Sequence, residues 1–347
     1  MNGNPKVLLI ATQDTKFEEG RFLRQCLEEA GSQVIHLDPS VRRTVGGAEI
    51  SPDAIAAAAG KTMEEVRALG HEGKCQAVMI EGSLKLSLAL HQRERLSGIL
   101  AIGGSMGTTL ASVVMQAFPF GLPKLLISTM ASGFTFPFVG VKDIAMLNAV
   151  CDISGLNSIS VDVYRNGAFG LAGMAHAYHL TQRAARPLVL VSTLGTTEAA
   201  SRRLRVSLEA DGFEVMVFHT TGAGGRTLDA IAAERKIAAI VDMSLVEIND
   251  HLYQGICSAG PDRATAGLKR GIPTIFAPGN CDFIIAGPIE DARALSGQAL
   301  SHAQSHPDRG AHRGARIEGG GGASGEDHPP SAGAGAILRS PRRVFEP

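Results

Sequence analysis

The feature that most constrains this chain is a regular alternation of short apolar runs with segments of helical period. Val7–Ala11 is a continuous apolar run, which is typical of a strand covered on both faces. The next segment, Phe17–Ala30, places its apolar residues on one helical stripe, and Gly31 ends it. Similar patterns predict strands at Val34–Leu37, Ala77–Ile80, Ile99–Ile102 and Lys124–Ser128, a helix at Thr62–Leu69, and a small-residue excursion at Thr44–Gly60. This alternation predicts an α/β fold with doubly wound parallel sheets.

The pattern restarts in the second half of the chain. Val7–Thr12 resembles Leu188–Thr193, and the segments that follow align without a gap. The aligned pairs are Leu23 with Leu204, Leu27 with Leu208, Gly31 with Gly212 and Val34 with Val215. We therefore predict two Rossmann-like parallel-sheet subdomains that arose by internal duplication, over residues 1–185 and 186–290.

The last segment, residues 291–347, has a different composition. Large apolar residues become rare, Gly319–Gly322 is a glycine run, and Pro329-Pro330 adds a further break. This composition predicts a low-complexity, disordered tail. Its histidines (His302, His306, His312 and His328) leave a metal-binding tract as the alternative.

Composition excludes several classes of partner. The 347 residues carry a net charge of -1, and aromatic residues make up only 5% with no Trp. We therefore expect no nucleic-acid partner and no membrane partner. No pair of the five cysteines has CxxC spacing, and no apolar stretch fits a signal peptide or a membrane span. These features predict a cytoplasmic protein with free thiols.

A glycine-rich turn follows the run Ile99–Ile102. Its residues are Gly103, Gly104, Ser105, Met106, Gly107, Thr108 and Thr109. Such a turn presents backbone N–H groups at the positive end of a helix, which predicts a phosphate site. It lacks the lysine of a Walker loop, and the first strand of the chain leads into no glycine fingerprint. P-loop hydrolysis and NAD binding are therefore disfavoured, while a turn built only for close packing remains the alternative.

Other polar residues follow neighbouring strands of the same predicted sheet. Thr12, Asp14 and Thr15 come after the first strand, and Thr129 and Ser132 come after Lys124–Ser128. Ligands of open α/β sheets bind at the carboxyl ends of the strands, where these groups meet the glycine turn. Asp14 is a candidate for a metal-bound water or a ribose hydroxyl, with a helix cap as the alternative.

The second half offers weaker candidates. Thr221–Arg226 combines turn amides with a guanidinium and predicts a site for phosphate or carboxylate. Glu247 is its best general acid or base, with a solvated helix start as the alternative. Two other functions therefore stay open: a small-molecule hydrolase or lyase acting between the subdomains through Asp14 or Glu247, and a nucleotide-gated protein-interaction module. No residue is assigned as catalytic.

Six segments together resemble a known family. They are Ile102–Thr109, Leu126–Gly133 (LISTMASG), Asn148–Asn157 (NAVCDISGLN), Leu194–Glu198 (LGTTE), Ser258–Arg263 (SAGPDR) and Ala277–Gly279. In order and in length they are similar to the ATP-binding domain family of the tomato mosaic virus resistance protein and its uncharacterised bacterial relatives. The resemblance covers about residues 5–288.

The resemblance implies ATP and Mg²⁺ as cofactors, a homodimer, and an unsettled physiological role. It implies nucleotide contacts from Gly103–Thr109 and from Thr12, Asp14, Thr15, Thr129 and Ser132, with no side chain assigned to the metal. The family continues beyond the Gly287-Pro288 region with further strands and helices, which this chain does not match. A divergent or out-of-frame end is our hypothesis, and it predicts an incomplete, less stable second subdomain.

Overall fold

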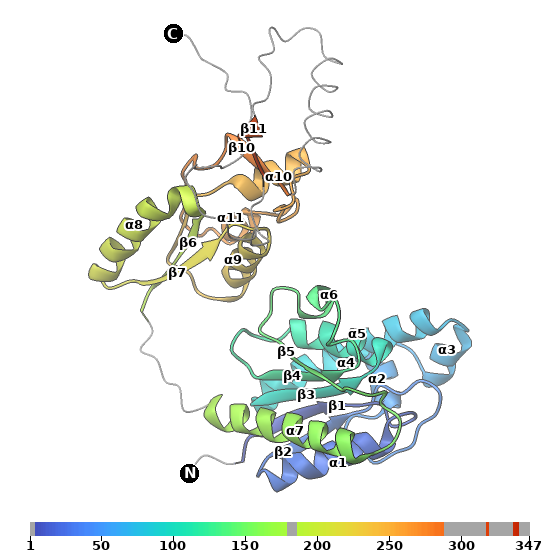
Figure 1. Ribbon diagram of the computed structural model, residues 1–347. Coiled ribbons are helices and arrows are strands. Elements are labelled where there is room, and N and C mark those ends of the chain that lie inside the picture. The colour runs from blue at the N-terminus through green and yellow to red at the C-terminus, as the bar shows by residue number, and fades with distance from the viewer. Residues whose placement is uncertain (1–3, 179–185, 288–316, 319–335, 340–347) are drawn as a thin grey trace, which may run out of the picture. The chain divides into compact units, whose positions relative to one another are not determined.

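A computed structural model of the protein describes residues 4–178, 186–287, 317–318 and 336–339. The chain divides into two compact units, Met1–Arg183 and Ala184–Pro347 (Figure 1). Each unit contains its own parallel sheet, so the predicted fold class is confirmed.

The first unit is built on five parallel strands in the order β2-β1-β3-β4-β5. The strands are β1 (Lys6–Ile10), β2 (Gln33–Leu37), β3 (Gly98–Gly103), β4 (Lys124–Ser128) and β5 (Ala145–Asn148). The helices are α1 (Phe17–Glu29), α2 (Pro52–Ala58), α3 (Met63–Ala68), α4 (Glu72–Glu94), α5 (Ser105–Gln116), α6 (Phe136–Val139) and α7 (Ser158–Tyr178). The central strands are buried along their whole length, as their continuous apolar runs predict.

Helices cover both faces of this sheet. On one face, Leu23 of α1 and Tyr164 of α7 pack with Val7 and Leu9 of β1 in one apolar cluster. On the other, residues of α2, α3, α4 and α5 pack with Leu8 of β1. Adjacent residues of a strand point to opposite faces, so β1 contributes to both clusters.

One predicted strand is wrong. Ala77–Ile80 lies inside α4, a helix of 23 residues. The buried residues of that helix include Cys75, Met79, Gly82 and Ser83, which recur at helical spacing and lie on one face. A run of four apolar residues fits either a strand or a buried helix. Here the helical spacing of the buried residues around the run indicates a helix.

The second unit contains a four-stranded parallel sheet with the order β7-β6-β8-β9. Its elements are β6 (Leu188–Thr193), the 3-10 turn η1 (Gly195–Thr197), α8 (Glu198–Ala210), β7 (Glu214–His219), α9 (Ala223–Glu234), β8 (Ala239–Asp242), α10 (Val246–Tyr253), α11 (Thr265–Lys269) and β9 (Thr274–Phe276). Four strands of each unit share one topology, with β6, β7, β8 and β9 in the places of β1, β2, β3 and β4.

The register differs by one residue from the sequence comparison. Val34 pairs with Val7, whereas Val215 pairs with Val189 and not with Leu188. A shift of one residue moves every side chain of a strand to the other face. Val189 therefore takes the place of Val7, although the helices and the second strands keep the gapless alignment.

A smaller antiparallel sheet follows, with β10 (Phe283–Gly287), β11 (Ile317–Glu318) and β12 (Ala336–Arg339) in the order β10-β12-β11. The predicted disordered tail, residues 291–347, lies outside the described residues apart from β11 and β12. No helix in the described part of the chain has the length and apolar character needed to cross a bilayer.

Candidate functional site

The glycine turn of the first unit leads from buried β3 into α5. Gly104 is the N-cap residue, with extended backbone, and no side chain caps the helix there. The first N–H groups of a helix have no acceptor within it, and they lie at its positive end. These N–H groups have no side-chain cap, which is the arrangement that an anion site at this turn requires.

The three glycines of this turn have different structural roles. A Cβ atom on Gly103 would lie 2.7 Å from backbone atoms of Gly107, so close packing requires glycine there. A Cβ on Gly104 would have only Thr129 Oγ1 at 4.0 Å, and a Cβ on Gly107 would make ordinary contact with Ile102 O at 3.6 Å. The packing alternative therefore accounts for Gly103 and leaves the other two glycines unexplained.

The hydroxyl groups of the turn do not all face outward. Thr108 is buried, and its Oγ1 donates to Gly103 O (3.1 Å) and lies 2.6 Å from Ser128 Oγ. Thr109 donates to Ser105 O (2.9 Å) within the helix. Thr108 thus holds the turn against β4, and of the turn's three hydroxyl residues only Ser105 lines the neighbouring cavity.

A cavity of about 660 Å³ joins the turn to the loop after β1, a volume within the usual range for small-molecule sites. Its lining residues are Ile10, Ala11, Thr12, Asp14, Thr15, Lys16, Pro39, Val41, Arg42, Glu72, Cys75, Gln76, Met79, Ile102, Gly103, Gly104, Ser105, Met106, Gly107 and Leu110. It thus brings together the two groups of residues that the sequence predicts to share an edge. Thr129 lies beside Gly104 and Ser132 is exposed, and neither lines the cavity.

Asp14 organises the loop after β2. Its Oδ2 accepts from the backbone N–H groups of Val41 (3.2 Å) and Arg42 (3.0 Å), and its own N–H donates to Ser40 Oγ (3.0 Å). It does not cap α1, whose N-cap is Lys16 with no side-chain cap bond, so the alternative cap role is wrong. Asp14 thereby fixes the loop that carries Arg42 at the cavity wall.

A second carboxylate, Asp38, supports this arrangement from the interior. It is fully buried, and its Oδ1 accepts from Gln13 N (2.9 Å) and Ser40 N (3.1 Å), so it joins the loops after β1 and β2. Burial raises the pKa of Asp38, although the hydrogen bonds from Ser40 and Gln13 act in the opposite direction. Sequence reasoning missed Asp38, although its position directly after a strand at the same edge is the signal that marks it.

Charged groups of both signs line the cavity. Lys16 donates through Nζ to Ile153 O, and Gln76 Nε2 donates to Met106 O (2.8 Å). Arg42 adds a guanidinium, and Asp14 and Glu72 add carboxylates. Within the described ranges no three His, Cys, Asp or Glu residues gather as a metal cluster.

The predicted anion site of the second unit is filled by a residue of the protein. Glu247 is fully buried, and its Oε1 accepts from the N–H groups of Gly222 (2.7 Å) and Gly225 (2.9 Å). Its Oε2 accepts from Arg263 Nε (2.7 Å), and Arg263 also forms two bonds to Asp242 (2.8 and 3.0 Å). Glu247 is therefore neither solvated nor open to a substrate. Arg226 is also engaged, since it donates to Ser258 O (2.9 Å).

Polar side chains also close the strand ends of the second sheet. Asn280 Nδ2 donates to Ser244 Oγ (2.8 Å), which lies 2.7 Å from Thr220 Oγ1, and Thr196 donates to Asn280 Oδ1. These residues follow four different strands and satisfy one another. In the first unit, by contrast, the residues after β1 and β3 line the larger cavity.

Comparison with known proteins gives matches over both units. Residues 5–180 match the "Uncharacterised protein family (UPF0261) N-terminal domain", and residues 186–305 match the corresponding C-terminal domain. A UPF0261 protein of Clostridium tetani is 37% identical over 291 residues, which is 83% of this chain and 71% of that protein. One from Brucella suis is 32% identical over 287 residues, covering 81% and 68%.

The predicted relationship to the tomato protein is confirmed. The "ToMV resistance protein Tm-1(GCR237)" of Solanum lycopersicum is 28% identical over 315 residues, which cover 83% of this chain and 41% of that protein. Among solved structures, the glycosyltransferase SnogD from Streptomyces nogalater aligns at 12% identity with a TM-score of 0.25. That similarity is too low to support an argument about function.

Proposed function

This chain belongs to the UPF0261 family, and we propose from the site itself that its first unit binds ATP together with Mg²⁺. The observation that carries this proposal is the cavity of about 660 Å³ that joins the uncapped N-terminus of α5 to the loop after β1. A phosphate chain is the ligand that such a helix N-terminus favours, and the resemblance of the turn to an ATP-binding family selects the nucleotide.

The lining residues suit separate parts of this ligand. Gly104 and Gly107 leave room for phosphate oxygens to approach the backbone amides. Arg42 supplies a guanidinium for the same charge, and Asp14 and Glu72 supply the hard oxygen donors that Mg²⁺ prefers. Ile102, Met79 and Leu110 form an apolar wall suited to a base.

We propose binding and assign no catalytic residue. In the first unit, the described carboxylates at the cavity are Asp14, engaged by two backbone amides, and Glu72. ATP in this proposal acts as an effector or as a slowly used substrate, and measurement of phosphate release distinguishes the two.

Calorimetric titration with Mg-ATP tests the proposal. The wild-type chain is expected to bind, and Gly104→Leu is expected to weaken binding by about tenfold or more, because the new side chain occupies the space in front of the amides. The Cβ position of Gly104 is open, so the fold should tolerate the change, and circular dichroism checks this.

Gly170→Leu is the matched control. Gly170 is an exposed residue of α7 whose Cβ position has no described atom within 4 Å, and it lies away from the cavity lining. It should bind Mg-ATP like the wild type. Failure of the wild type to bind, or equal binding by a folded Gly104→Leu variant, would overturn the proposal.

A further inference from the structure

The two units differ at the outer edge of the strand that ends each sheet, β2 in the first and β7 in the second. In the first unit the chain covers this edge with its own residues. Ile50 N donates to His36 O (3.0 Å), Asp38 N donates to Ile50 O (3.0 Å), and the two segments run parallel at this bridge. His36 N donates to Glu49 Oε2 (2.8 Å).

Glu49 also pairs with a helix residue. Its two carboxylate oxygens accept from Arg24 of α1 at 2.8 and 3.1 Å, in a bidentate arrangement, while Arg24 Nε donates to Glu28 (2.9 Å). Bidentate arginine–carboxylate pairs are among the stronger and more specific polar contacts. Glu49 and Ile50 thus form a short acidic and apolar segment that is joined to β2 by an isolated parallel bridge and to α1 by the Arg24 pair.

Among the described residues of the second unit, no segment lies along the corresponding edge of β7. In the gapless alignment Arg24 and Glu28 correspond to Arg205 and Glu209 of α8, which form a looser pair at 3.7 Å. The connection after β7 spans only residues 220–222, whereas the one after β2 spans residues 38–51. Among the described residues β7 therefore ends the sheet, and Arg205 has no counterpart of Glu49.

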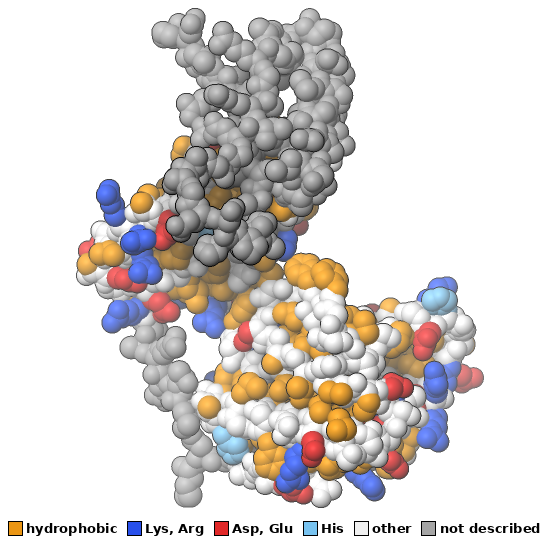
Figure 2. Space-filling view, viewed as in Figure 1, with side chains coloured by type: hydrophobic (Ala, Val, Ile, Leu, Met, Phe, Trp, Pro, Cys, Tyr) orange, Lys and Arg blue, Asp and Glu red, His pale blue; other side chains and the backbone are white. Residues whose placement is uncertain are grey.

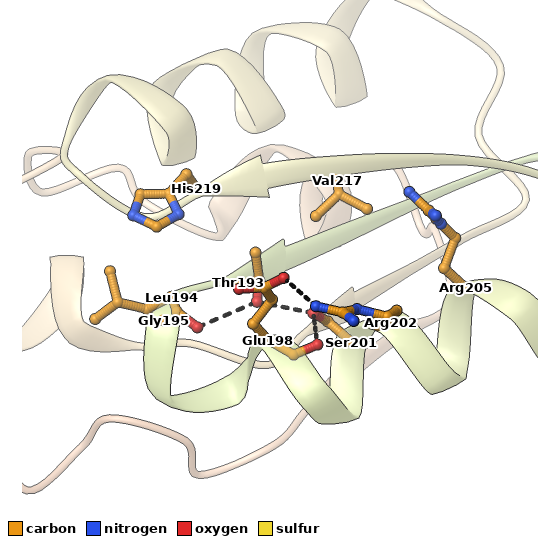
Figure 3. Close-up of a pocket in the computed structure, with 9 residues that line it drawn as sticks. All are labelled: Thr193, Leu194, Gly195, Glu198, Ser201, Arg202, Arg205, Val217 and His219. Carbon is orange, nitrogen blue, oxygen red and sulfur yellow. Dashed lines mark hydrogen bonds and ion pairs between the residues drawn. The ribbon is translucent and has the colours of Figure 1, made fainter.

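A cavity of about 380 Å³ extends from the end of β6 (Thr193–Gly195) along α8 to this edge of β7. Figure 3 shows Val217 and His219 of β7 and Arg202 and Arg205 of α8 around it. Side chains of Lys and Arg lie over this part of the unit together with those of Asp and Glu (Figure 2). Val217 is 41% exposed, although it occupies the place of His36, which is buried.

The backbone of β7 also faces this space. Glu214 N donates to Pro187 O (3.0 Å), as Gln33 N donates to Pro5 O (2.8 Å), so the two edge strands have the same alternation. Since His36 turns its N–H and C=O outward to Glu49 and Ile50, Val217 turns its own outward as well. An edge strand with free backbone groups is a template for an added strand.

We propose that this edge of the second unit binds an extended segment of a partner protein, in which an acidic residue precedes a branched apolar residue. The segment adds parallel to β7, its carboxylate pairs with Arg205, and its backbone bonds Val217. The branched side chain points to the other face of the strand, toward half-buried Met216 and Phe218, as Ile50 does in the first unit.

The first unit supplies the probe for the test. A fluorescein-labelled peptide of residues 46–51 (GGAEIS) is titrated with the full chain, and binding is followed by anisotropy. We expect saturable binding that Arg205→Gln weakens by about tenfold. A peptide in which Gln replaces Glu should bind the wild-type chain about tenfold more weakly than the original peptide does. On Arg205→Gln the two peptides should bind with nearly equal affinity, because the loss of one partner already removes the ion pair.

Arg203→Gln is the control, because Arg203 is an exposed residue of the same helix that does not line the cavity. It should bind the peptide like the wild type. Absence of saturable binding at millimolar protein, or an equal loss in Arg203→Gln, would overturn the proposal. Protection of the Val217 amide from hydrogen exchange in the free protein would overturn it too, since this chain or a second copy would then cover the edge.

Discussion

At the scale of single residues, the glycines of the turn between β3 and α5 have different roles: close packing requires one of them, and the others leave room for a ligand. Gly103 is fixed by the backbone of Gly107, which leaves no room for a Cβ atom. Gly104 and Gly107 have that room, and both face the cavity. A glycine-rich sequence alone does not show which of its members serve the fold, because the distinction depends on the atoms opposite each one.

This distinction predicts opposite effects of two identical substitutions. Gly103→Ala should lower the free energy of unfolding by about 1–3 kcal/mol, because the new Cβ forces the helix start away from the strand. Gly107→Ala should leave it unchanged or raise it by up to about 1 kcal/mol, since alanine favours the helix. Urea denaturation followed by circular dichroism compares them, and equal losses would contradict this account.

His36 predicts a pH dependence of stability. Burial lowers the pKa of His36, against the hydrogen bond to Ala11 O and the nearby carboxylates of Asp38 and Glu49, which raise it. Below about pH 6.5 the unfolded chain takes up a proton that the folded protein takes up only at lower pH. The contribution of His36 to stability is therefore present above that pH and is lost as the pH falls.

The free energy of unfolding, measured in urea at pH 7.5 and pH 5.5, checks this sign. The loss on acidification should be smaller for His36→Gln than for the wild type. His71→Gln is the control, because His71 is exposed, and it should lose as much as the wild type. An undiminished loss in His36→Gln would assign the effect to other groups.

At the scale of elements, hydrophobic periodicity predicts the type and the bounds of those helices and strands that are determined by their own residues. Lys124–Ser128 is a strand at the predicted bounds, and α1 begins at the predicted residue. The strand predicted at Ala77–Ile80 was wrong because four apolar residues do not distinguish a strand from one turn of a helix such as α4. The one-residue shift of β6 escaped the comparison because strand register depends on pairing with β7 and β8, which local similarity does not record.

Prediction of the site was limited because local sequence does not record contacts between segments that are far apart in the chain. The glycine turn and Thr12–Thr15 were predicted to meet because parallel strands end at one edge, and both line one cavity. Arg42 and Gln76 reach it from a long connection and from α4, which have no strand-end signal. Thr108 was predicted to face the ligand, but its hydroxyl bonds Gly103 and Ser128, because the helix turns it inward.

At the scale of the whole molecule, the two units differ in how fully their helices pack. Leu23 and Leu27 of α1 are fully buried, whereas the aligned Leu204 and Leu208 of α8 are only partly buried. Both large apolar clusters of the first unit are formed from its own residues. The first unit therefore contains the interactions that it needs to fold.

A fragment of residues 1–183 is expected to fold alone, with a cooperative urea transition. In the full chain, the second unit should unfold at lower urea, because its leucines bury less apolar surface. Tryptophan is absent from the chain, so circular dichroism and hydrogen exchange are the suitable measurements. A fragment without a cooperative transition, or a second unit that outlasts the first, would contradict this expectation.

The position of Glu247 against Gly222 and Gly225 has one further consequence. A carboxylate that belongs to the chain is present at these amides at an effective concentration that dissolved anions do not reach. Free phosphate or nucleotide therefore competes poorly for this turn at ordinary solution concentrations. The amides of this turn therefore need no dissolved anion, because Glu247 satisfies them within the fold.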